Sequence, residues 1–166
     1  MPTEMKFVSA EEIATLGMGE AHALEYLRSG GARGHLWDFG AAGGPAWASC
    51  LLLQTFGAKT GARRLAPLLY GLTRGGFIIV ASKGGAPHHP SWYHNIRAAK
   101  DVTVQIATQA LSCAWDEPEG DQRTRMWEEM VDIFPPYADY QKATARTIPI
   151  VRLIPLREVA ILEQSI

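Results

Sequence analysis

Residues 48–82 read ASCLLLQTFGAKTGARRLAPLLYGLTRGGFIIVAS, and this stretch decides the fold. It contains three short apolar runs, which we interpret as β-strands, at residues 48–55, 65–70 and 77–82. Glycine-containing turns separate the runs, GAKTGARR before the second and RGG before the third. Strands this short and this closely spaced are typical of a mainly β domain, and they argue against a doubly wound α/β sheet.

The same pattern continues toward the C-terminus. We predict further strands, the first two joined as a hairpin around Thr108–Gln109, at residues 102–107, 110–115, 148–154 and 159–162. Pro149 within the third of these suits an edge strand or the start of a strand. Several short strands with few helices between them predict a small β-barrel with peripheral helices.

The helices are predicted outside the strand-rich stretch, at residues 9–29, 90–99, 123–134 and 137–145. Ser9 to Glu12 reads as a capping box, and Pro90 suits the first turn of a helix. The third helix places Met126, Met130 and Phe134 on one apolar stripe, which we interpret as core packing. Between the first helix and the first strand, residues 30–45 are rich in glycine and are expected to form a loop.

The 166 residues are 47% hydrophobic and 20% charged, which fits one globular domain. Within it we separate an N-terminal helix and glycine-rich loop (1–45) from a β-barrel domain (46–166). Cys50 and Cys113, on predicted strands, are expected to be small core residues. With no signal peptide or membrane span in the sequence, these two thiols indicate a cytoplasmic protein.

Charge is distributed unevenly along the chain. Residues 39–100 contain seven Lys and Arg residues and no Asp or Glu, whereas the whole chain has a formal net charge of −1. This asymmetry predicts that the middle third faces an anion. Chance clustering on a solvated face is the alternative at this point.

Two glycine-rich segments in this middle third are candidate binding loops. In residues 57–64, GAKTGARR, Lys59 offers a point charge and Arg64 a planar fork for a phosphate, although the order of residues is not that of a P-loop. An ordinary basic turn is the alternative. In residues 81–90, ASKGGAPHHP, a strand ends in a glycine pair whose backbone is open to a flat ligand. The three nearby histidines lack the spacing of a metal site, so no metal is predicted.

Both segments resemble blocks of the deazaflavin-dependent nitroreductase and F420H2-dependent quinone reductase family, which are split-barrel reductases. The first block reads Leu53, Thr55, Gly57, Lys59, Thr60, Gly61, Arg64, Pro67 and Leu68. The second reads Val80 to Gly85, Pro87, His89, Pro90, Trp92, Tyr93 and Asn95. A third block, Pro135 to Gln141, is followed by Arg146, Ile148 and Pro149. The resemblance covers roughly residues 48–155.

The resemblance implies a split β-barrel, similar to FMN-binding and pyridoxamine-phosphate-oxidase folds, with coenzyme F420 (8-hydroxy-5-deazaflavin) as cofactor. The cofactor-binding residues that it implies are Lys59, Thr60, Arg64, Pro67, Leu68, Val80, Ala81, Ser82, Lys83, Gly84, Gly85, Trp92, Asn95 and Tyr137. Lys59 and Arg64 would hold the phosphate, while Val80 to Lys83 would run along the ring. The implied catalytic residues are Tyr140, Tyr137 and Ser82, with Tyr140 as the main proton donor.

The sequence departs from the family pattern at two positions. Many members have Arg where this chain has Ala58, so part of the phosphate clamp is weaker or comes from Arg63. Some members have Tyr where this chain has Phe134, which removes one proton donor and bears on nitro reduction.

The function that follows is a reductase in which reduced F420 donates a hydride to an activated alkene, a quinone or a nitro compound. We expect a small-molecule acceptor, a monomer or weak homodimer, at most peripheral membrane contact and no nucleic acid. Three alternatives stay open: an FMN- or haem-binding relative of the barrel, a deazaflavin carrier without activity, and a nucleic-acid binder that uses the basic middle segment.

Overall fold

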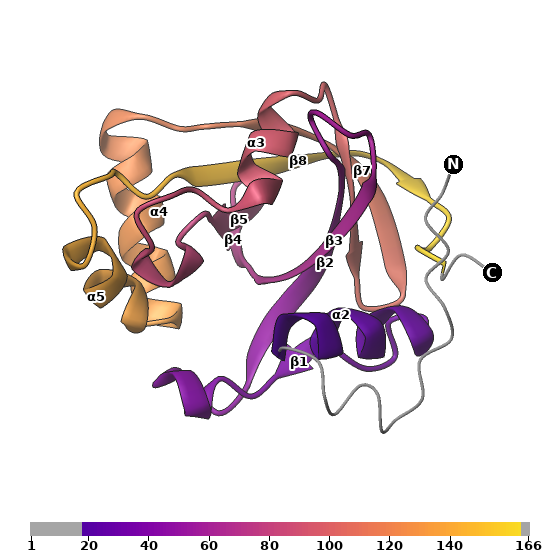
Figure 1. The fold of residues 1–166 in the computed structure, drawn as a ribbon, viewed down its shortest axis with the longest axis horizontal. Helices are drawn as coiled ribbons and strands as arrows, with labels where there is room; N and C mark the ends of the chain where they lie inside the picture. The colour runs from indigo at the N-terminus through magenta and orange to yellow at the C-terminus, as the bar shows by residue number, and fades with distance from the viewer. Residues whose placement is uncertain (1–17, 164–166) are drawn as a thin grey trace.

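The computed structural model describes residues 18–163, in which eight strands form one curled antiparallel sheet (Figure 1). The strands are β1 (Leu36–Trp37), β2 (Ala48–Phe56), β3 (Arg63–Leu69), β4 (Gly71–Thr73), β5 (Gly76–Val80), β6 (Val102–Ile106), β7 (Gln109–Asp116) and β8 (Ile150–Val159). Their order is β1-β2-β6-β7-β8-β5-β4, and β3 pairs with residues Cys50 to Phe56 of β2, beside the Leu52–Gln54 segment that also pairs with β6. This confirms the predicted mainly β fold, a split β-barrel with peripheral helices.

The helices lie outside the curled sheet. They are α2 (Met18–Arg28), α3 (Ser91–Arg97), α4 (Gly120–Ile133) and α5 (Pro136–Lys142), with 3-10 turns η1 (Gly40–Ala42) and η2 (Lys83–Gly85). In Figure 1, α4 and α5 lie together at one end of the molecule, while α2 packs beside β3 at the other. The predicted helices at residues 90–99, 123–134 and 137–145 are thus confirmed, with ends that differ by a few residues. Of the predicted helix 9–29, the part before Met18 lies outside the described residues.

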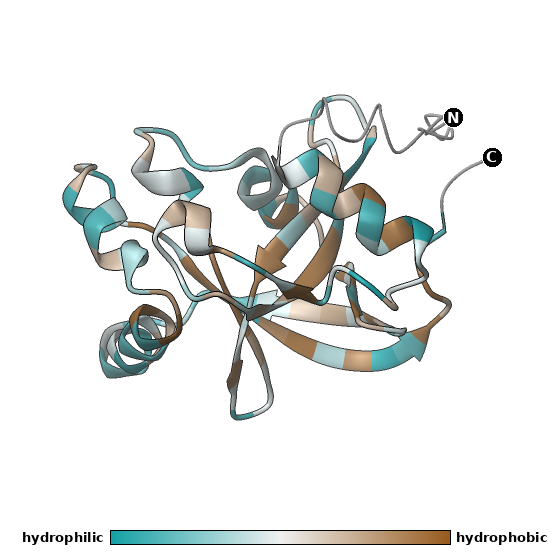
Figure 2. Ribbon diagram, turned by 90° about the horizontal axis from the view of Figure 1, so that it is seen from below, coloured by the Kyte–Doolittle hydropathy of each residue, from teal (hydrophilic) through white to brown (hydrophobic). Residues whose placement is uncertain are grey.

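Hydrophobic residues fill both sides of β2. Leu51 and Leu53 belong to a core cluster beneath α3, whereas Cys50 belongs to a second cluster beneath α4 and α5. Side chains alternate between the two faces along a strand, so β2 is buried on both faces, as its continuous apolar run predicts. Figure 2 shows the corresponding brown segments along the strands at the centre of the molecule.

Three sequence expectations need correction, and one pair of alternatives is decided. The strand predicted at 159–162 is wrong: β8 ends at Val159, and Leu162 instead packs on Tyr26 in a small third cluster. β8 pairs with β5 on one side and β7 on the other, so it is not an edge strand; Pro149 lies directly before Ile150, which confirms the other alternative, the start of a strand. Residues 30–45 are not loop alone, since they form β1 and η1, and the three-residue β4 was not predicted.

The N-terminal part contacts the barrel through Tyr26. Its single hydroxyl proton is shared between the carbonyl oxygens of Cys50 (3.1 Å) and Gln105 (3.0 Å), and its oxygen accepts from the amide of Ala107 (2.7 Å). Because these partners are on β2, on β6 and just after β6, one buried side chain of α2 fixes the helix to the sheet. The division into residues 1–45 and 46–166 stays a prediction.

Candidate functional site

A cavity of about 330 Å³ lies between β3, the end of β5, the η2 loop and α5. Its walls are formed by Phe39, Ala42, Pro67, Leu68, Leu69, Val80, Ser82, Lys83, Gly84, Pro90, Trp92, Phe134, Tyr137 and Tyr140. Nine of these come from the residues that the sequence blocks indicate as a site. Segments more than 50 residues apart in sequence therefore meet around one space of the size that a planar ligand needs.

The η2 loop forms one wall of this cavity and has an unusual backbone. Lys83, Gly84 and Gly85 have positive φ values of 45°, 63° and 81°. Glycine adopts this region freely, which explains the glycine pair, whereas Lys83 is held there at a cost. The side chain of Ser82 is 9% exposed and lines the cavity, while Ala81 and Gly85 are buried behind the wall.

Aromatic rings form the opposite wall. Tyr137 and Tyr140 on α5 pack edge to face with ring centroids 6.2 Å apart, and Phe134 lies 4.8 Å from Tyr137. Phe39 from the segment before η1 completes the group, in edge contact with Phe134 at 5.6 Å. Burial raises the pKa of Tyr137 well above its usual range, so this phenol stays protonated at physiological pH.

The basic turn lies beside α3, at the far end of the β2–β3 pair. Asn95 on α3 accepts from the amide of Ala58 (3.0 Å) and donates to the hydroxyl of Thr55 (3.1 Å). The hydroxyl of Thr60 accepts from the amide of Ala62. Lys59 and Arg64 are exposed, and neither has a partner among the described residues. Both cations are therefore available to an anion, whereas Asn95 and Thr60 shape the turn.

The same strand joins the turn to the cavity. Arg64 and Leu68 are four residues apart on β3, so their side chains leave the same face of the strand, roughly 13 Å apart along it. Arg63 leaves the other face, where it donates to Gln54 (2.7 Å) and to the carbonyl of Glu163 (3.0 Å). Arg63 is thus engaged elsewhere and does not replace the arginine missing at Ala58.

Three functional features were not predicted from the sequence. Phe39 and Ala42 line the cavity although they belong to the segment interpreted as a loop, and Leu69 lines it beside the predicted Pro67 and Leu68. The glycine at position 44 is the sequence feature that relates to Phe39 and Ala42. A Cβ at this position would lie 2.3 Å from the ring of Phe134, so only glycine lets this segment pack against the aromatic wall. The glycine-rich composition of that segment allows it to pack closely against the aromatic wall.

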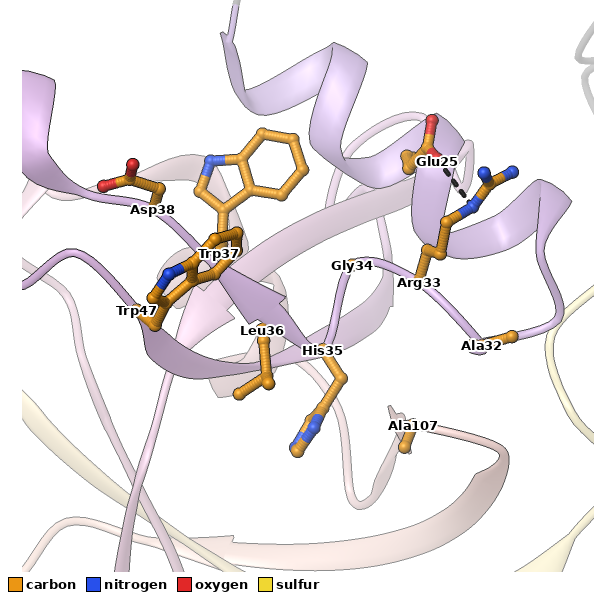
Figure 3. Close-up of a pocket in the computed structure, with 11 residues that line it drawn as sticks. Glu25, Ala32, Arg33, Gly34, His35, Leu36, Trp37, Asp38, Trp47 and Ala107 are labelled. Atoms are coloured by element: carbon orange, nitrogen blue, oxygen red, sulfur yellow. Dashed lines mark ion pairs between the residues drawn. The ribbon is translucent and has the colours of Figure 1, made fainter.

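A larger cavity, of about 710 Å³, lies away from all the predicted site residues. Figure 3 shows it between α2, the segment before β1, and Ala107, with the indoles of Trp37 and Trp47 among the side chains that line it. The Glu25–Arg33 ion pair (2.9 Å) lies at its edge. Its lining includes Glu25, Arg33, His35 and Asp38 but none of the residues that the sequence blocks indicate, so size alone does not make it the functional site.

The remaining candidate groups do not form a reactive centre. Cys50 and Cys113 are fully buried, and burial raises the pKa of Cys50 to about 12 and that of Cys113 to about 11. Neither thiol is therefore a nucleophile at neutral pH, and both are core residues as predicted. Among residues 18–163, no three His, Cys, Asp or Glu side chains are grouped as metal ligands. No helix in the described part is long and apolar enough to cross a membrane.

Solved structures share this fold. An F420-H2 dependent reductase, FDR-A, is 42% identical to this chain and matches it with a TM-score of 0.57, over 63% of this chain and 92% of its own. A structure described as a domain-swapped dimer is also 42% identical, with a TM-score of 0.58 over 63% of this chain and 78% of its own. The haem storage protein HutZ of Vibrio cholerae has a TM-score of 0.50 over 65% of this chain and 82% of its own; at 14% identity it shows the fold alone.

Sequence relatives identify the family. The F420H(2)-dependent quinone reductase Rv1261c of Mycobacterium tuberculosis is 37% identical over 106 residues, which cover 62% of this chain and 71% of that protein. The family model described as F420H(2)-dependent quinone reductase matches residues 21–155, a range that includes both walls of the cavity and the basic turn. The chain therefore belongs to the F420H(2)-dependent quinone reductase family, and coenzyme F420 is its cofactor.

Proposed function

We propose that this protein is a reductase that passes a hydride from reduced F420 to a small quinone, and that the cavity of about 330 Å³ is its active site. One observation carries the proposal. The lining of the cavity combines an open glycine backbone with a pair of tyrosines, and the strand that lines it leads directly to two cations, Lys59 and Arg64, that have no partner among residues 18–163.

The residues of the cavity fit a flat deazaflavin ring. Gly84, which has no Cβ and no atom nearby that a Cβ would meet, leaves the loop backbone open to a planar group. Trp92, Pro67 and Leu68 add apolar surface on the side of β3 and α3. When bound, reduced F420 supplies the hydride. The protein then has to hold the ring, exclude water and provide a proton.

The basic turn is the proposed phosphate anchor. Lys59 and Arg64 are exposed and unpaired within the described chain, and Asn95 fixes the turn that carries Lys59 against α3. A phosphate bound by a lysine and an arginine forms charge-assisted hydrogen bonds, which are stronger than those between neutral groups. Because the turn has Ala58 where many members have Arg, this anchor consists of two cations rather than three.

The proposed proton donor is Tyr140. Its hydroxyl belongs to a half-buried ring at the wall of the cavity, whereas Tyr137 is almost fully enclosed. Tyr137 packs against Tyr140 and Phe134 and closes the ring side of the cavity. The Ser82 hydroxyl, on the opposite wall, is positioned to donate a hydrogen bond to the acceptor or the ring.

A quinone is the favoured acceptor because the family and its Mycobacterium tuberculosis relative are described by that substrate. Activated alkenes and nitro compounds stay as further acceptors to be tested. Phe134 lacks the hydroxyl that some relatives have, so we expect nitro reduction to be the slowest of the three. We also propose a monomer or weak homodimer in the cytoplasm.

The experiment that tests the proposal is a fluorescence titration of the purified protein with F420 and with FMN. We expect F420 to bind and FMN not to bind. The double variant Lys59→Ala/Arg64→Ala should weaken F420 binding at least about tenfold, because two charged hydrogen-bond donors are lost. The control Arg74→Ala/Arg157→Ala removes the same charge from exposed sites and should bind as the wild type does.

Three results would contradict the proposal. Tight FMN binding without an F420 response would indicate a flavin-binding relative of the barrel. Equal losses of F420 affinity in both double variants would mean that general charge, and not the turn, attracts the cofactor. If F420 binds but no quinone, enone or nitro acceptor is reduced, the protein is a deazaflavin carrier and the proposed reductase activity is wrong.

A further inference from the structure

Arg146 lies between α5 and β8 and donates hydrogen bonds to the backbone behind the cavity. Its Nε donates to the carbonyl oxygen of Ala86 (2.8 Å), and its Nη1 donates to that of Ala81 (3.1 Å). Its Nη2 donates to the carbonyl oxygen of Ser82 (2.6 Å). One planar guanidinium thus binds three carbonyls of the loop that joins β5 to α3.

A fourth bond completes this contact. Nη1 of Arg146 also donates to Nδ1 of His89, at 2.9 Å. Arginine has no acceptor, so His89 accepts with Nδ1 and carries its proton on Nε2. The imidazole is packed against Tyr93 (4.8 Å between ring centroids) and His94 (5.8 Å) on α3. Arg146 therefore donates hydrogen bonds to residues at both ends of the loop that runs from Ala81 to His89.

The loop needs such support because of its backbone. Lys83 has a φ of 45°, and the two glycines that follow it are also left-handed. The amide of Ala81 donates to the Pro149 carbonyl (3.0 Å), and the backbone hydrogen bonds internal to the loop are those of the Gly85 amide (2.9 Å to the Ser82 oxygen) and the Ala86 amide (3.1 Å to the Lys83 oxygen). A left-handed non-glycine residue persists only where its surroundings hold it. The carbonyls bonded to Arg146 lie on either side of this strained segment.

Arg146 is itself fixed to the opposite wall. The side chain of Gln141, at the end of α5, donates to the carbonyl of Arg146 (2.8 Å) and accepts from the amide of Ile148 (2.9 Å). In addition, Gly85 packs directly on α5, where a Cβ would lie 2.7 Å from the carbonyl oxygen of Tyr140. The loop with Ser82 and the helix with Tyr140 are thus connected through one side chain.

We propose that Arg146 is a positioning residue that sets the distance between Ser82 and Tyr140, two polar groups that both line the cavity. The inference rests on the proposed function, because that function gives these two walls their roles. Arg146 acts through the residues that it bonds: four of its five N–H groups donate to three carbonyls and an imidazole, and it does not line the cavity.

The first test uses the cofactor-free protein and compares Arg146→Lys with Arg157→Lys. Lysine keeps the charge but not the planar fork, so Arg146→Lys should speed hydrogen exchange at the Gly85 and Ala86 amides roughly tenfold or more, as expected for loss of charged hydrogen bonds. Amides of β5 should exchange as before. Arg157 is exposed on β8 without a partner in the described chain, and its variant should leave all these rates unchanged.

The second test is a double-mutant cycle on the rate of quinone reduction. If Arg146 acts by placing Ser82, then Arg146→Lys should lower kcat about tenfold in the wild type and much less in the Ser82→Ala background. Combined with Lys59→Ala, which affects the distant phosphate anchor, Arg146→Lys should show its full effect. A residue that merely stabilises the fold would give additive losses in both combinations.

The outcomes separate this inference from the proposed function. Unchanged exchange at Gly85 and Ala86 in Arg146→Lys overturns the positioning role, even if F420 binds and is turned over. A wild type that does not bind F420 overturns the proposed function, while the exchange test still decides on Arg146. If Arg146→Lys does not fold, Gln141→Ala must show the same faster exchange in weaker form, and its absence there also overturns the inference.

Discussion

At the scale of single residues, Tyr137 and Tyr140 belong to one helix but have different surroundings. Tyr137 is 6% exposed, packs on Phe134 and Trp127, and has a pKa raised by burial. Tyr140 is half-buried at the mouth of the cavity, where its proton can be replaced from solvent. A proton donor has to be reprotonated after each turnover. The more exposed Tyr140 therefore suits that role, whereas the buried Tyr137 suits closing the cavity.

Tyr140→Phe is therefore expected to lower kcat for quinone reduction by about 100-fold, the effect of losing a positioned proton donor. F420 affinity should change by no more than about twofold, because the ring remains. Steady-state kinetics and fluorescence titration of the same preparations measure both quantities.

Tyr137→Phe is the matched control for this prediction. It removes a hydroxyl that has no hydrogen-bond partner among residues 18–163, and we expect it to lower kcat less than about tenfold. If Tyr137→Phe instead abolishes turnover while Tyr140→Phe is fully active, the two roles are reversed.

The sequence indicated most residues of the cavity but not how they are held. Pro67, Leu68, Ser82 and Trp92 were found because ordered blocks of residues carried them. Arg146 was visible in the third block, yet no role followed, since its bonds go to carbonyls and an imidazole 57 to 65 residues away. Carbonyl groups carry no sequence information, so only the fold reveals which arginine binds them.

At the scale of elements, β8 shows why local patterns misplace a strand. Pro155 cannot donate to a sheet, and a proline usually marks an edge or the end of a strand. Here it lies opposite Cys113, where the register between β7 and β8 shifts. A bulge leaves a residue outside the regular ladder, so β8 continues past the proline in the middle of the sheet. The separate strands predicted at 148–154 and 159–162 are the result of missing this bulge.

The contact between η2 and α5 predicts that alanine substitution destabilises the fold more at Gly85 than at Gly84. Gly84 and Gly85 both have positive φ, so alanine at either position should cost about 1 kcal/mol of backbone strain. Only at Gly85 would the new Cβ meet another element, at 2.7 Å from the Tyr140 carbonyl oxygen. Gly85→Ala should therefore lower the free energy of unfolding by about 3 kcal/mol in total, because overpacking adds to the strain.

Urea unfolding of Gly84→Ala and Gly85→Ala measures this difference, with F420 titration as a second readout. We expect Gly85→Ala to bind F420 more weakly, because the displaced loop carries one wall of the cavity. Equal destabilisation of the two variants would show that α5 moves away without cost, and that the loop and the helix are not coupled.

At the scale of the whole molecule, the sequence predicted the location of the positive charge but not its use. Of the seven cations between residues 39 and 100, Arg63 is bonded to Gln54 and Arg97 pairs with Glu117. Lys59 and Arg64 are unpaired in the described structure and lie at the end of the strand that lines the cavity. The asymmetry in the sequence sums all of these charges, whereas the fold separates cations already engaged from those open to a ligand.

Three histidines link the stability of the whole fold to pH. His22 is 3% exposed and stacks on Trp37 with ring centroids 3.8 Å apart, while His35 bonds to the Tyr70 hydroxyl and His89 to Arg146. Burial lowers the pKa of all three below the ordinary value of 6.5. For His89, the positive charge of Arg146 adds to the effect of burial.

Below pH 6.5 the unfolded chain therefore binds protons that the folded protein does not. The free energy of unfolding should be nearly constant above this pH and should fall as the pH decreases toward the lowered pKa values, by at most about 1.4 kcal/mol per pH unit for each histidine. Urea unfolding at pH 7.5 and at pH 5.5 measures the fall.

His22→Phe tests the part of this effect that the N-terminal helix contributes. Phenylalanine keeps a flat ring against Trp37 but cannot bind a proton, and it also loses the bond to the Gly34 carbonyl (2.7 Å). That loss lowers stability equally at both pH values, so the difference between them isolates the titration. We expect the difference to be smaller in His22→Phe than in the wild type. An unchanged difference would mean that His22 does not titrate on unfolding, and a wild type more stable at pH 5.5 would contradict the predicted sign.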